Sequence, residues 1–179
     1  MSYTLKDSQE TRDSYERLGY GSNYLYVAGS FTPASSYTLT KVALYLLKTS
    51  APTSLITVHI YSDSSGSPSS LLATSTTTID SSTLSTSTYG WFEVLFDGIA
   101  LTSGTKYHIV AYVSSYSSTN YIRMGYYGTV TGQTVKYSAN ATSWITEDST
   151  AQLDFRTYIT DATGSYVPII LQQSEGFKC

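Results

Sequence analysis

Residues 89–115 constrain the fold more than any other part of the sequence. They read YGWFEVLFDGIALTSGTKYHIVAYVSS, and apolar side chains recur at every second position in each half. These positions are Phe92, Val94 and Phe96 in the first half, and Tyr107, Ile109, Ala111 and Val113 in the second. A period of two is typical of a pleated strand with one buried face. Asp97-Gly98 and Ser103-Gly104 are turn formers, so we predict two strands joined by a turn-rich connection.

The same alternation recurs over most of the remaining sequence, in short runs separated by segments rich in Ser, Gly and Pro. The further strands that it predicts cover residues 23–31, 37–48, 55–62, 71–79, 121–127, 134–138 and 153–159. The 18 tyrosines and the low charged fraction of 13% also suit sheet surfaces better than helices. We therefore predict an all-β chain, an antiparallel β-sandwich of about nine strands.

A chain of 179 residues is long enough for one domain with a sizeable core. We expect this domain to cover residues 21–160, with an N-terminal arm (1–20) and a C-terminal docking tail (161–179). The arm holds seven of the charged residues: Lys6, Asp7, Glu10, Arg12, Asp13, Glu16 and Arg17. Asp7 and Glu10 resemble a capping box, which predicts a short helix over residues 8–18. Such a helix is marginal alone, so a partner surface would hold it.

The tail carries one apolar cluster, YVPIIL, followed by a polar end. We expect both ends of the chain to dock onto partner subunits. The residues expected to make these contacts are Tyr15 and Leu18 in the arm, and Tyr166, Val167, Ile169, Ile170 and Leu171 in the tail.

Charge and hydropathy argue against several classes of partner. The net charge is −3 and the sequence has no basic stripe, so we expect no binding to nucleic acid. No apolar run is long enough to span a membrane. The first residues also lack the basic and apolar regions of a secretory signal. The lone cysteine, Cys179, excludes an internal disulfide and leaves open a free thiol or an intermolecular link.

No group of residues forms a recognisable catalytic motif, so we expect no enzyme. The alternation places His59 and His108 on outward-facing positions, and no nucleophile motif accompanies either. Glu93 and Asp154 lie on predicted strands, but nothing in the sequence brings them to one sugar-sized cleft.

The spacing of histidines and cysteines matches no common zinc site, and we expect no catalytic metal. Asp63, Asp80, Asp97 and Asp154 lie at strand ends or edges. The favoured interpretation is that they close turns. A structural calcium ion bound by scattered oxygens remains the alternative.

Aromatic residues are the most informative surface feature. Tyr116, Tyr121, Tyr126, Tyr127, Tyr137 and Trp144 gather between residues 114 and 145. Rigid rings provide contact area at a low entropic cost, and sugars stack on them. We identify Tyr116, Tyr121, Tyr126, Tyr127 and Trp144 as candidate glycan-binding residues. The alternative is that Tyr is simply the preferred sheet-face residue of this chain.

Several strand and turn signatures over residues 23–160 resemble a known family. They include Leu39-Thr40-Lys41-Val42, His59-Ile60-Tyr61-Ser62-Asp63 followed by Gly66-Ser67-Pro68, Gly90-Trp91-Phe92, Leu101-Thr102-Ser103-Gly104-Thr105-Lys106-Tyr107 and Leu153-Asp154-Phe155-Arg156. These pieces are similar to the jelly-roll, carbohydrate-binding-like or choice-of-anchor modules of bacterial surface proteins and of phage virion and tail proteins. The resemblance implies a jelly roll, but such a fold hosts many functions.

Two functional hypotheses follow. The first is a non-enzymatic structural protein of a virion, such as a capsid decoration, neck or tail component, or of another extracellular assembly. It would be homo-oligomeric, would dock through its termini, and would lie on the virion surface or outside the cell. The second is a carbohydrate-binding or adhesin module that holds a host-surface glycan on the aromatic cluster.

Overall fold

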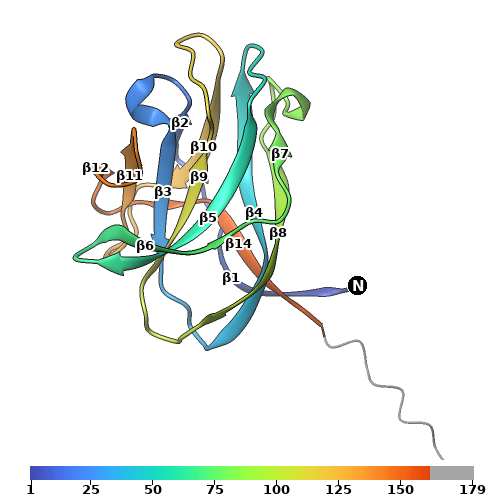
Figure 1. Cartoon of the computed structure of the whole chain (residues 1–179), viewed down its shortest axis with the longest axis vertical. Coiled ribbons are helices and arrows are strands. Elements are labelled where there is room, and N and C mark those ends of the chain that lie inside the picture. Colours follow the sequence, from blue (N-terminus) through green and yellow to red (C-terminus); the bar gives the residue numbers. More distant parts are fainter. Residues whose placement is uncertain (162–179) are drawn as a thin grey trace, which may run out of the picture.

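Two antiparallel sheets packed face to face form the structure, a computed structural model that describes residues 1–161 (Figure 1). Each sheet contains seven strands. Residues 1–161 contain no α-helix, and their only helical segments are two short 3-10 turns, Ser22–Tyr24 and Ser81–Thr83. The predicted all-β antiparallel sandwich is therefore confirmed.

Sheet A is built around one long central strand, β4. Its members are β1 (Tyr3–Gln9), β2 (Ser14–Leu18), β4 (Tyr37–Thr49), β8 (Gly90–Leu101), β10 (Tyr121–Tyr127), β13 (Gln152–Leu153) and β14 (Phe155–Thr160). β8 pairs along one side of β4. On the other side, β14 pairs with the first half of β4 and β10 with its end. β1 then adds to β14, and β2 to β10.

Sheet B has the order β12-β11-β3-β9-β5-β6, with β7 paired to β5. Its strands are β3 (Tyr26–Phe31), β5 (Leu55–Ser64), β6 (Ser67–Thr74), β7 (Ile79–Asp80), β9 (Tyr107–Tyr112), β11 (Val135–Ser138) and β12 (Ile145–Asp148). β9 lies between β3 and β5, and its Val110 is opposite Ala28 on one side and His59 on the other. This register decides which side chains share the outer face.

The core fills the space between the sheets with aliphatic and aromatic side chains from alternate positions. Val42, Leu44 and Leu46 of β4 and Ile56 and Val58 of β5 are among its members, each at most 1% exposed. Burial of each such side chain contributes about 1.5–3 kcal/mol. The alternation in the sequence therefore reflects one face turned toward this core.

The predicted N-terminal helix is wrong, because residues 3–9 and 14–18 form strands of sheet A. Asp7 does not cap a helix. Its carboxylate accepts hydrogen bonds from the Tyr37 hydroxyl at 2.8 Å and from the Ala34 amide at 3.1 Å. Leu18 is fully buried in the core. The first residues thus belong to the sandwich itself and not to a separate arm.

The strands also differ from the prediction in number and in their ends. Residues 1–161 contain fourteen strands rather than about nine, because several short edge strands carry little alternation. The predicted turn at Asp97-Gly98 lies inside β8. Gly98 takes a positive φ of 100° there, and the β4–β8 register shifts nearby, between Leu39 and Lys41. The predicted docking residues Tyr166, Val167, Ile169, Ile170 and Leu171 lie outside the described residues.

Candidate functional site

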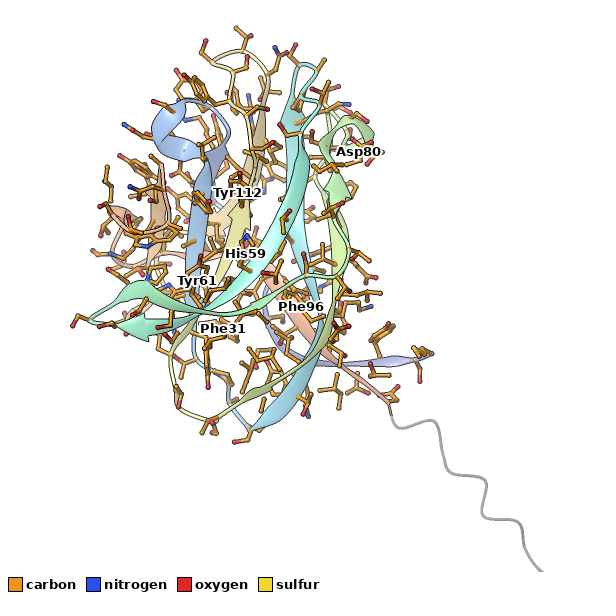
Figure 2. All side chains as sticks on the ribbon, viewed as in Figure 1. Phe31, His59, Tyr61, Asp80, Phe96 and Tyr112 are labelled. Atoms are coloured by element: carbon orange, nitrogen blue, oxygen red, sulfur yellow. The ribbon has the colours of Figure 1, made fainter. Side chains whose placement is uncertain are left out.

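The outer face of sheet B carries a continuous row of aromatic side chains. Tyr61 and His59 of β5 are followed by Tyr112 of β9, Tyr26 of β3 and Trp144, which directly precedes β12. Successive ring centroids lie 6.3, 6.2, 4.5 and 6.4 Å apart. Figure 2 shows Tyr112, His59 and Tyr61 following one another along the β9 and β5 part of the sheet. We call these five residues the aromatic row.

Small side chains beneath the rings explain how the row is held. Ala28 and Val110 lie on the same outer face and are fully buried by the residues around them. Tyr61, Tyr26 and Trp144 pack against this pair. Because short side chains on neighbouring strands leave room above the sheet, the larger rings can lean over them. The row is therefore a packed layer outside the main core.

The row carries no formal charge near neutral pH. Burial raises the pKa of the Tyr26 and Tyr61 phenols, so their hydroxyls stay protonated. Burial also lowers the pKa of His59, which keeps its imidazole neutral. The His59 Nδ1 lies 3.0 Å from the Thr74 hydroxyl. The row thus combines ring edges and faces with neutral hydrogen-bonding groups.

A buried histidine–carboxylate pair lies at one end of this face. His108 Nε2 is 2.7 Å from Asp63 Oδ1. His108 does point to the outer side of its strand, as the alternation predicts, but it is fully buried, so the expectation of a surface histidine is wrong. Burial lowers the pKa of His108, although Asp63 opposes this shift.

This pair lacks the geometry of a hydrolytic triad. The other ring nitrogen of His108, Nδ1, is buried and has no hydrogen-bond partner within residues 1–161. A general base must reach the proton that it removes, directly or through one water. An enclosed imidazole has no such access, so the geometry supports a structural role for the His108–Asp63 pair.

The predicted glycan-binding residues do not form one cluster. Trp144 belongs to the aromatic row, whereas Tyr126 packs against the main core. Tyr121 pairs with Thr49 of β4, and Tyr127 ends β10, both in sheet A. Tyr116 is 58% exposed in a loop and lines a pocket of about 190 Å³.

Sequence reasoning missed four members of the row as binding residues: Tyr26, Tyr61, Tyr112 and His59. Alternation placed Tyr26 and Tyr61 on outward positions, but it could not show that β3, β9 and β5 are neighbours. The sequence signal that could have found them is that Tyr26, Tyr61 and Tyr112 each occupy an outward-facing position on a separate strand.

The acidic residues take different roles. Asp63 and Asp80 close turns as predicted, accepting hydrogen bonds from the Gly66 amide at 3.1 Å and the Ser82 amide at 2.8 Å. Glu93 pairs with Lys41 at 2.8 Å. Within the described part of the chain, no three His, Cys, Asp or Glu side chains come together in a way that could hold a metal ion.

Two buried carboxyl groups are unusual. Asp154 lies between β13 and β14, is 1% exposed, and neither carboxylate oxygen has a hydrogen-bond partner within residues 1–161. Burial raises its pKa to about 7, although Arg12 opposes the shift. Burial likewise raises the pKa of Glu16 to about 7. Glu93 is exposed and bound to Lys41, whereas Asp154 is buried.

Comparison of the chain with protein-family models gives no match, and comparison with curated proteins gives no similar sequence. None of the helical segments in residues 1–161 is long and apolar enough to cross a membrane.

Proposed function

We propose that this protein is a non-enzymatic carbohydrate-binding module that holds a glycan on the outer face of sheet B. The observation that carries this proposal is the aromatic row, five rings in succession from three neighbouring strands and one loop. Rings fixed by packing lose little conformational entropy on binding and offer a large contact area. The apolar faces of sugars would pack on them.

The chemistry of the row favours an uncharged glycan. Tyr26, Tyr61 and His59 are neutral at physiological pH for the reasons given above. Their hydroxyl and imidazole groups can donate hydrogen bonds to sugar hydroxyls and accept hydrogen bonds from them. A carboxylated or sulfated sugar would find no cation in the row to neutralise it.

The connectivity supports a jelly roll, in line with the resemblance to carbohydrate-binding-like modules. The chain crosses repeatedly between the two sheets, with β3, β5 and β9 in sheet B and β4, β8 and β10 in sheet A. We therefore propose that the sandwich is a jelly roll, because in a jelly roll the chain passes back and forth between two packed sheets.

A glycan array followed by titration tests this function. For the best-bound neutral oligosaccharide, Tyr112→Ala should weaken binding by at least about tenfold, because the central ring is lost. Tyr158→Ala, on the outer side of β14 in sheet A, is the matched control and should bind like the wild type. Failure to retain any glycan at millimolar concentration, or equal losses in both variants, would contradict the proposal.

A second candidate is a structural component of a virion or other extracellular assembly. Its support is the edge strand β1, which pairs with β14 on one side only. Leu5 is 46% exposed there, and Figure 1 shows β1 running out past the sandwich. Such an edge can add a strand from a partner. Of the predicted contacts in the arm, Tyr15 is exposed, whereas Leu18 is buried and unavailable.

Light scattering on the full chain tests this candidate. Self-association through β1 predicts an oligomer that Leu5→Glu weakens, because a charge is placed on the pairing edge. Leu55→Glu, at another exposed leucine, is the control. A wild-type chain that stays monomeric at its highest soluble concentration would argue against self-assembly through β1.

A further inference from the structure

Two arginines face each other on the outer side of sheet A. Arg17 of β2 is directly opposite Arg123 of β10. These two strands are neighbours in sheet A (Figure 1). Their side chains point away from the core, because the adjacent Leu18 and Ile122 are buried in it. Like charges at directly opposite positions of an antiparallel pair destabilise the sheet. Residues that lower the stability of the free protein in this way are typical of a binding site.

Tyrosine rings hold the two guanidinium groups. The Cζ atom of Arg17 lies 4.2 Å from the centroid of the Tyr20 ring, and that of Arg123 lies 4.8 Å from the centroid of the Tyr15 ring. Arg123 Nε also donates a hydrogen bond to the Thr49 hydroxyl at 2.9 Å. Both groups are therefore fixed in position before any ligand arrives, which lowers the entropic cost of binding.

Within residues 1–161, neither arginine forms an ion pair with a carboxylate. The three ion pairs of residues 1–161 are Lys41–Glu93, His108–Asp63 and Arg156–Glu10. The pKa of the nearby Tyr121 phenol is lowered, first by a hydrogen bond to Thr49 and further by Arg123 and Arg17. The site thus carries a positive field within a chain whose net charge is −3.

The same face continues as a surface of rings and cations. Arg12 lies over Tyr89 at 4.0 Å, and Tyr89 stacks with Tyr45 at 5.3 Å. The ring centroids of Trp91 and Tyr45 are 4.8 Å apart, and Arg156 Cζ lies over the Trp91 ring, 4.1 Å from its centroid. Trp, Tyr and Arg are the residue types enriched at the centres of protein–protein interfaces.

We propose that the Arg17–Arg123 pair binds an acidic segment of a protein partner. The planar guanidinium fork matches a carboxylate with two parallel hydrogen bonds, and arginine clusters recognise acidic motifs in this way. The ring-rich surface beside the pair would extend the contact. Two pockets within residues 1–161, one lined by Gly19 and Ala51 and the other by Lys6 and Tyr37, do not include these arginines, and the open outer face of sheet A suits a segment laid along the surface.

This inference does not depend on the proposed glycan site, which lies on the opposite face of the sandwich. One sheet face would attach the module to an acidic neighbour, and the other would remain free for a glycan. A failure of either proposal leaves the other testable.

The test is fluorescence anisotropy of the full chain with a labelled octaglutamate peptide at low and moderate salt. We expect saturable binding, and the Arg17→Gln/Arg123→Gln double variant should weaken it about tenfold or more. The control is Lys6→Gln/Lys106→Gln, which removes the same charge elsewhere and should bind like the wild type within a factor of about two. Arg123→Lys should recover only part of the affinity, because the fork is lost.

Thermal unfolding of the same variants separates this role from a structural one. The double glutamine variant should unfold close to the wild-type temperature, because the repulsion that is removed offsets the lost contacts with Tyr15, Tyr20 and Thr49. Three results would overturn the inference: no binding of octaglutamate, equal losses in the arginine and lysine double variants, or tighter binding of oligogalacturonate or oligothymidylate than of octaglutamate.

Discussion

At the scale of single residues, two carboxyl groups couple folding to pH. Asp154 and Glu16 have ordinary pKa values of 3.8 and 4.5, and burial raises each to about 7 in the folded state. The folded protein therefore binds protons more tightly than the unfolded chain between about pH 4 and 7. The stability that depends on these protons is fully present below about pH 4, and is lost as pH rises through about 7.

We predict that Asp154→Asn flattens this pH dependence. The contribution of Asp154 to the free energy of unfolding should fall by up to about 4 kcal/mol between pH 4 and 8, while the lowered pKa values of His59 and His108 give a contribution of opposite sign. The variant should lose that contribution, so its stability relative to the wild type should rise with pH. Urea denaturation at several pH values measures this.

Glu16→Gln is the matched comparison for this prediction, because it should remove the contribution of the second carboxyl group whose pKa is raised. An Asp154→Asn variant with the same pH slope as the wild type would show that the carboxyl group is not held in its neutral form.

At the scale of strands, the two sheets are in close contact where β3 meets β13. A Cβ atom added at Gly29 would lie 2.5 Å from Leu153 Cγ and 2.8 Å from its Cβ. We predict that Gly29→Ala destabilises the protein by about 1–3 kcal/mol, because the sheets must separate or Leu153 must move. Chemical denaturation measures the loss.

Gly21→Ala is the control for the Gly29 prediction. Its added Cβ would meet only Tyr24 Cδ2 at 3.8 Å, and its backbone is extended, with φ −155°. A Gly29→Ala variant as stable as Gly21→Ala would mean that the sheets are not in close contact there.

The first strand gives another prediction at this scale. Asp7 accepts hydrogen bonds from the Tyr37 hydroxyl and the Ala34 amide and so ties β1 to the chain around β4. Asp7→Ala should lower the free energy of unfolding by about 1–3 kcal/mol, because the part-buried Tyr37 hydroxyl loses its charged acceptor. Asp97→Ala, at an exposed position of β8, should change it little. Equal effects would restore the interpretation of residues 1–20 as a separate arm.

The strands that the sequence could predict are those with one face on the core. β4, β5 and β9 alternate because their inner residues meet the opposite sheet. β1 and β2 could not be predicted, since their charged residues suit a solvated helix as well as an edge strand. Glu16 occupies an inward position of β2, where the alternation pattern predicts an apolar residue.

Candidate sites were less predictable than strands for a related reason. Proximity along the sequence suggested a cluster from Tyr116 to Trp144, but the aromatic row joins strands separated by up to 86 positions, from Tyr26 to Tyr112. Only the pairing order and register bring them together. The same holds for Arg17 and Arg123, whose opposition depends on the β2–β10 register.

At the scale of the whole molecule, the sandwich presents two faces of different chemistry. Sheet B carries a neutral aromatic row, and sheet A carries arginines stacked on rings. The two tryptophans divide between them, with Trp144 in the row and Trp91 on sheet A. Each face therefore has its own spectroscopic reporter.

The most direct test of the central claim is tryptophan fluorescence during titration with the best-bound neutral glycan. The Trp91→Phe variant, which keeps Trp144, should show a saturable change in emission with the affinity of the wild type. The Trp144→Phe variant, which keeps Trp91, should show no change in emission at any concentration. A saturable signal from Trp91 with none from Trp144 would place the glycan on the other face and contradict the account.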